Sequence, residues 1–130
     1  MNNATTPRGG LRAHQESVKL PVPDLVVSLR DLLGAKLVAY IGSVNETRAV
    51  REWAEGKRSP SSIVVKRLRE AYHVAALVAE KDHRQVIQAW FQGMNPQLGD
   101  VSPARLLREG DIDEVAPQVL AAARSFASIV

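Results

Sequence analysis

Four basic side chains toward the end of the first half of the sequence are suited to chemistry with an anionic partner. Arg48 and Arg51 lie three positions apart, so a helix would project both from one face, and Lys57 and Arg58 follow it directly. A guanidinium group donates two hydrogen bonds at once to a phosphate or to the edge of a guanine. The predicted DNA-contacting residues are Asn45, Thr47, Arg48, Arg51, Lys57 and Arg58.

The roles of these residues follow from their types. Arg48, Lys57 and Arg58 are expected to contact phosphates, whereas Thr47 and Arg51 are expected to face a groove. The charge distribution favours this, since residues 1–70 hold 12 Lys and Arg against 7 Asp and Glu, and residues 71–130 hold 5 against 7. The alternative is a solvated face on which the arginines pair with nearby glutamates.

The sequence contains no recognisable catalytic or cofactor-binding motif. It contains no cysteine, which excludes disulfides, thiolate metal sites and cysteine nucleophiles. The three histidines, His14, His73 and His83, have no third ligand at useful spacing, so no metal site is predicted. Without a glycine-rich phosphate loop or a nucleophile elbow, we expect no cofactor and no enzymatic activity.

Apolar periodicity predicts an all-α protein. Residues 24–33, 35–41 and 46–55 form three short helices, with Asp24 and Asn45 as N-caps and glycines at the ends. Two longer helical patterns follow around residues 61–81 and 82–93, the second with Val86, Ala89 and Trp90 inward. The expected organisation is a flexible arm (1–23), a helix-turn-helix region (24–60) and a helical C-terminal domain (61–130).

The second and third short helices have the organisation of a helix-turn-helix. Gly42 supplies the small residue that a tight turn requires, and an apolar helix precedes it. Val50 and Trp53 are expected to pack inward, which leaves the basic residues of the third helix facing out.

Residues 94–111, "MNPQLGDVSPARLLREGD", contain a dense set of helix caps. Asn95 and Pro96 start a turn, Leu98 points inward and Gly99 breaks the turn. Ser102 caps a helix that begins at Pro103, and Gly110 ends it. Leu106 and Leu107 are expected to be buried.

A last amphipathic helix follows, capped by Asp111 or Asp113. Pro117 implies either that this helix begins near Ala116 or that it is kinked. Trp90 and Phe91, adjacent on the preceding helix, are expected to form core or to place one ring on a partner surface.

Two parts of the sequence resemble a known family. Gly42, Trp53, Gly56, Pro60 and the pair Arg67–Leu68 resemble the helix-turn-helix of Xre-type regulators. The motif within residues 94–111, which follows this region in the sequence, is similar to the toxin-binding domain of Xre/MbcA/ParS antitoxins. Its matching positions are Asn95, Pro96, Leu98, Gly99, Pro103, Leu106, Leu107 and Gly110.

The resemblance implies an antitoxin of a type II toxin–antitoxin system. Such antitoxins neutralise RES-domain toxins, which consume NAD, and tend to bind their own operator DNA. The family also implies a homodimer or a higher assembly with the toxin, with the C-terminal helix and tail over the toxin's active-site cleft. Carried over, the residues expected to enter that cleft are Arg124, Ser125, Ser128 and Ile129.

Two other functions fit the residues. One is a stand-alone Xre-like transcriptional regulator whose C-terminal half serves dimerisation, and the other is a scaffolding module without DNA binding. The sequence has no apolar run of membrane-spanning length and no apolar signal segment at its start, so we expect a cytoplasmic protein without a membrane partner.

Overall fold

The computed structural model describes residues 11, 13–15 and 19–129, so most of the expected N-terminal arm lies outside it. Within the described residues the chain is helical, which confirms the predicted all-α class. The elements are α2 (Val22–Leu33), α3 (Ala35–Ile41), α4 (Thr47–Ala54), α5 (Ser62–Ala79), α6 (Arg84–Gln92), the 3-10 turn η2 (Pro96–Leu98), α7 (Pro103–Glu109) and α8 (Ile112–Ala127).

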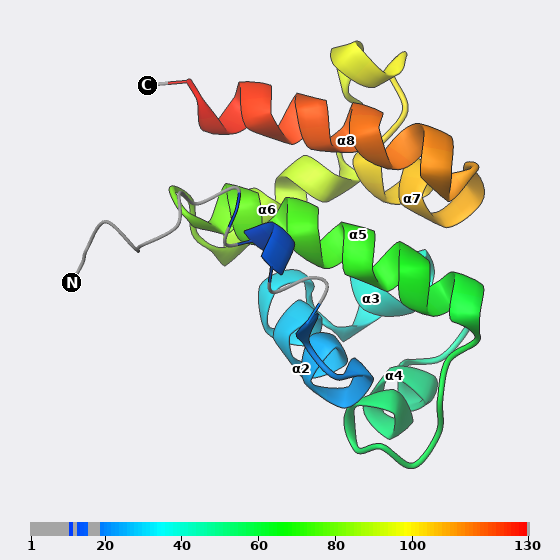
Figure 1. Cartoon of the computed structure of the whole chain (residues 1–130). Coiled ribbons are helices and arrows are strands. Elements are labelled where there is room, and N and C mark those ends of the chain that lie inside the picture. The colour runs from blue at the N-terminus through cyan, green and yellow to red at the C-terminus, as the bar shows by residue number, and fades with distance from the viewer. Residues whose placement is uncertain (1–10, 12, 16–18, 130) are drawn as a thin grey trace, which may run out of the picture.

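The long helix α5 lies between the two halves of the molecule. It packs against α2 on one side and against α8 on the other, as Figure 1 shows. Its buried face includes Leu68, Ala71, Ala75 and Val78, which are spaced three or four positions apart, as residues on one face of a helix are. One apolar core therefore runs through both halves, and α5 contributes to each.

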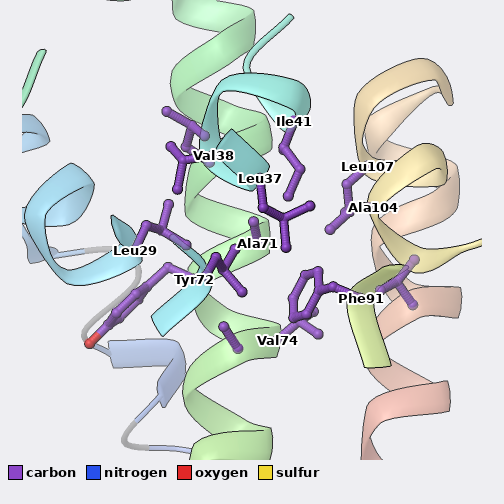
Figure 2. Close-up of a cluster of buried hydrophobic side chains, with 14 of the residues drawn as sticks. Leu29, Leu37, Val38, Ile41, Ala71, Tyr72, Val74, Phe91, Ala104 and Leu107 are labelled. Carbon is purple, nitrogen blue, oxygen red and sulfur yellow. The ribbon is translucent and has the colours of Figure 1, made fainter. Parts of the chain in front are cut away.

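A second connection joins α3 to α7. Figure 2 shows Leu37 and Ile41 of α3 directed toward Ala104 and Leu107 of α7, with Phe91 of α6 beside them. All five side chains are buried. The helix-turn-helix region is thus packed directly on the element that carries the "SPARLL" segment.

The turn between α3 and α4 depends on a close approach of two residues. Gly42 has an ordinary helical φ of −78°, and the left-handed residue of the turn is Ser43, with φ 59°. A β-carbon on Gly42 would lie 3.0 Å from the Trp53 ring. Glycine is needed here because the buried indole of Trp53 leaves no room, so the predicted small residue is confirmed with a steric cause.

Two predicted helix starts are wrong. Asp24 does not cap α2, because that helix begins at Val22 with Pro21 before it, and Asp24 lies in its first turn. Glu46, and not Asn45, occupies the N-cap position of α4. In both cases the helix start is shifted from the polar residue that the local pattern favoured.

The inward face of α6 is also different from the prediction. Its buried residues are Ile87 and Phe91, whereas Val86 and Trp90 are half-buried and Ala89 is exposed. The helix is rotated by about one residue because it packs between α2 and α7. Phe91 fills the core, and Trp90 is left at its edge.

Candidate functional site

The segment between α6 and α7 is built by the caps that the sequence predicts. Asn95 Oδ1 accepts a hydrogen bond from the backbone N–H of Gln97 at 2.9 Å, and Pro96 is the first residue of η2. Gly99 follows in the left-handed region, with φ +67°. The backbone N–H of Asn95 donates to the oxygen of Val101, which closes the loop into an isolated bridge. Leu98 is buried beneath it.

The following helix, α7, is also capped as predicted, but one residue that was expected to be buried is not. Ser102 Oγ accepts from the Arg105 N–H, and Pro103 and Leu107 are buried. Leu106 is only half-buried. Gly110 ends the helix as predicted, and its φ of −77° is open to any residue.

Space, and not backbone angle, explains why position 110 holds glycine. A β-carbon there would lie 2.6 Å from Val115 Cγ1 and 2.9 Å from the Leu106 oxygen. Asp111 then caps α8, since its Oδ1 accepts from the Asp113 N–H at 3.1 Å. The helix begins at Ile112 and contains Pro117, so the alternative start near Ala116 is wrong.

An arginine of α5 holds this helix end in place. Arg67 donates from one guanidinium nitrogen to the backbone oxygens of Leu107 at 2.7 Å and Gly110 at 2.8 Å. Two C-terminal carbonyls that lack partners inside α7 are thereby satisfied by a cation. The sequence gives Arg67 only as part of a family resemblance. Its role at this helix end could not be predicted, because its partners are backbone atoms about forty positions away.

The structure places an apolar groove where α6, η2 and α8 meet. Trp90 and Phe126 line it, with ring centroids 6.2 Å apart. Met94 is 80% exposed and Ile129 is 71% exposed at its rim. Large apolar side chains that gather on a surface in this way are typical of protein-binding sites.

The four residues expected to enter a toxin cleft do not form one surface. Ser125 and Ile129 line the apolar groove, and Ser128 is exposed next to them, with its hydroxyl donating to the Ser125 oxygen at 2.9 Å. Arg124 lines a different hollow, between α5 and α8, together with Glu70. Neighbouring residues on a helix point about 100° apart, which separates Arg124 from Ser125.

Ion pairs compensate much of the basic face of the helix-turn-helix. Glu52 accepts Arg48 at 3.2 Å and lies 3.7 Å from Arg58, and Glu55 pairs with Lys57 at 3.2 Å. All three basic side chains are exposed, so these pairs are weak and open to exchange. The pairing that the sequence left as an alternative is therefore present for Arg48.

The remaining predicted DNA contacts lie at the start and middle of α4. Thr47 is its first residue, and Asn45 and Arg51 are exposed. Among the residues that the structure describes, Arg51 has no ion pair. Thr47, Arg48 and Asn45 line one shared hollow at the start of the helix.

Glu70 and Lys66, both on α5, have shifted pKa values. Burial raises the pKa of Glu70, against the opposing effect of His14 and Lys66. A hydrogen bond to Asp113 raises the pKa of Lys66. In the described part of the chain, no three His, Cys, Asp or Glu side chains lie close enough to hold a metal ion. None of its helices is long and apolar enough to cross a membrane.

No family model and no curated protein matches the chain. One chain of the crystal structure of the M. tuberculosis MbcT–MbcA toxin–antitoxin complex matches it with a TM-score of 0.63 and 27% identity, over 85% of this chain and 100% of that chain. The chain is similar to an MbcA-type antitoxin.

The match confirms the family resemblance drawn from the sequence motifs. The similarity extends over 85% of this chain, which is most of its length. It supports an antitoxin role and a toxin as the partner of this MbcA-like chain.

Proposed function

We propose that the chain is the antitoxin of a type II toxin–antitoxin pair in the cytoplasm. It sterically neutralises a RES-type toxin that consumes NAD, and it binds operator DNA to regulate its own expression. The observation that carries the proposal is the apolar groove between α6, η2 and α8, in a chain similar to MbcA-type antitoxins. The chain itself needs no catalytic group or cofactor for such a role.

The chemistry of the groove favours a protein as its occupant. Met94 and Ile129 present most of their apolar surface to water, which is unfavourable unless a partner covers it. Trp90 and Phe126 form an aromatic floor of the kind that carries binding energy in protein interfaces. The toxin is the occupant that the MbcA-like match supports.

The mode of inhibition follows from where the groove lies. The last turns of α8 form one wall of the groove, so a toxin bound there also contacts Ser125, Ser128 and Ile129. Arg124 points toward a second hollow, and we propose that it contacts the toxin outside the groove. Steric blocking of the toxin's active-site cleft requires only that this chain occupy the cleft, so the chain needs no catalytic side chain.

The eight motif residues act in this proposal by fixing shape. Asn95, Gly99 and Gly110 set the turns, and Leu98 and Leu107 are buried. They position η2 and α8 as the two walls of the groove. Of the motif positions, Asn95 and Pro96 also line the groove and are expected to touch the toxin.

The DNA part of the proposal depends on α4. Its exposed residues Thr47, Arg48 and Arg51, with Asn45, Lys57 and Arg58 around it, are the proposed contacts. A homodimer would present two such helices to two half-sites of an operator. A stand-alone regulator would use the same helix, and a second copy of the chain, instead of a toxin, would then cover the apolar groove.

Co-expression with the toxin tests the antitoxin role. The toxin candidate is the RES-like enzyme encoded by a neighbouring reading frame, and the readouts are growth and the cellular NAD level. We expect this chain to restore both, and Met94→Asp combined with Ile129→Asp to abolish the rescue. Ile63→Asp is the matched control, because Ile63 is 47% exposed but lies at the start of α5, away from the groove.

Three results would contradict the proposal. Toxicity and NAD loss that do not change when this chain is present would exclude an antitoxin for that enzyme. Full rescue by the groove variant, with the two proteins still forming a complex, would remove the groove from the interface. An equal loss of rescue in the Ile63→Asp control would show that a charge anywhere on the surface has the same effect.

A further inference from the structure

The hollow at the start of α4 joins the helix-turn-helix region to the C-terminal half. It is lined by Lys36 and Tyr40 of α3, by Asn45 and Arg48 at the start of α4, and by Arg108 of α7. It contains three cations and a single carboxylate, that of Glu46. Its cations come from three different helices, so no sequence spacing connects them.

The cation of Arg108 is held without a carboxylate. Its guanidinium carbon lies 4.6 Å from the centre of the Tyr40 ring, and Nη1 donates to the Tyr40 backbone oxygen at 2.9 Å. Within the part of the chain that the structure describes, neither Arg108 nor Lys36 forms an ion pair. A guanidinium stacked on a ring keeps its full charge and several free donors, and it is already ordered before a ligand arrives.

Arg108 differs in this respect from the cations predicted for DNA contact. Arg48, Lys57 and Arg58 are each close to a glutamate, so binding a phosphate would exchange one anion for another. Arg108 and Lys36 would gain an anion without losing one. A phosphate of a nucleic-acid backbone next to the start of α4 is the ligand that this arrangement fits.

We propose that Arg108 and Lys36 form a phosphate-binding site that extends the DNA surface of the helix-turn-helix onto the C-terminal half of the chain. The inference rests on the DNA binding proposed above and adds a contact from the domain otherwise assigned to the toxin. The helix α7, which carries Arg108, packs against α8, and α8 lines the apolar groove, so the two surfaces lie on neighbouring helices.

Fluorescence anisotropy with a labelled duplex tests the site. The duplex carries the DNA directly upstream of the chain's own coding sequence, and affinity is measured over a series of salt concentrations. We expect Arg108→Gln and Lys36→Gln each to weaken binding about 3- to 10-fold near 0.1 M salt and to reduce the salt slope by about one. Arg105→Gln is the control on the same helix, because Arg105 already pairs with Glu109 at 3.1 Å.

The salt slope separates a phosphate contact from a structural role. Arg108 also supports α3, so Arg108→Gln could loosen the fold, and the thermal midpoint of each variant is measured beside the affinity. Lys36 is exposed and makes no such contact, so Lys36→Gln tests the site in an intact fold. A purely structural arginine would leave the slope unchanged in the folded fraction.

The outcomes distinguish this inference from the function it rests on. If Arg51→Ala weakens binding while Arg108→Gln and Lys36→Gln keep the wild-type affinity and slope, the phosphate site is wrong and DNA binding stands. If the wild-type chain binds no duplex at any salt concentration, the proposed DNA function fails as well. Tighter binding to an RNA duplex of the same sequence would overturn the assignment to DNA.

Discussion

The guanidinium of Arg67 in α5 donates to the backbone oxygen of Gly110, 2.8 Å away, at the point where α7 ends and α8 begins. The same nitrogen reaches the Leu107 oxygen at 2.7 Å. A single side chain of the central helix thus fixes the corner from which α8 starts. The direction of α8 sets one wall of the apolar groove.

Replacing this arginine tests the corner. We expect Arg67→Met to lower the free energy of unfolding by about 2 kcal/mol, because two carbonyls lose a charged donor while the apolar stem is kept. Urea denaturation measures the loss, with an unchanged m-value as the sign of a two-state transition. Arg105→Met, an exposed residue in an i,i+4 pair, should leave the stability unchanged. Equal stabilities of the two variants would show that the Arg67 bonds contribute nothing.

The glycines of the loop should respond to alanine for different reasons. Gly110→Ala places a methyl group 2.6 Å from Val115 Cγ1, and we expect a cost of about 1–3 kcal/mol from overpacking. Adding Val115→Ala should recover part of that cost. Gly99→Ala has open space around its methyl group but a φ of +67°, so its cost of about 1 kcal/mol should not depend on Val115. Strict additivity at both positions in a double-mutant cycle would contradict the steric explanation.

Removing a carboxylate from the helix-turn-helix should strengthen DNA binding. Glu52 holds both Arg48 and Arg58, so Glu52→Gln frees two cations on the proposed DNA face. We expect the affinity for the upstream duplex to rise about 3- to 10-fold at low salt, with a steeper salt slope. Glu114→Gln, on α8, changes the net charge equally and serves as the control. An identical gain in both variants would indicate only a net-charge effect.

Glu70 should make stability depend on pH. Burial raises the pKa of Glu70 in the folded state, so the folded chain holds its proton more tightly than the unfolded chain does. The resulting stabilisation is complete below the ordinary pKa of a glutamate and is lost as the pH rises through the raised value. Glu70→Gln should therefore be more stable than the wild type at neutral pH and should flatten the profile between acidic and neutral pH. A parallel profile in the variant, measured by thermal unfolding, would assign the pH dependence to other groups.

Local sequence signals were sufficient for much of the structure. The caps at Asn95, Ser102 and Asp111 act within two or three residues, and each is present in the fold. The buried stripe of α5 follows from apolar periodicity over a long helix. Short helices contain fewer periodic residues. For this reason the predicted inward face of α6 and the predicted starts of α2 and α4 differ from the observed ones.

The sequence alone determined the all-helical class and the caps in the motif of an MbcA-like chain, because these depend on backbone preferences of neighbouring residues. It also located the turn at Gly42, although the contact with Trp53 that favours glycine there is a tertiary one. Only the tertiary structure decided which exposed residues share a surface. It brought Trp90 of α6 to Phe126 of α8, separated Arg124 from Ser125, and placed Arg108 of α7 and Lys36 of α3 on the same hollow. Such groupings depend on how helices far apart in the chain pack against α5, and no local spacing encodes that packing.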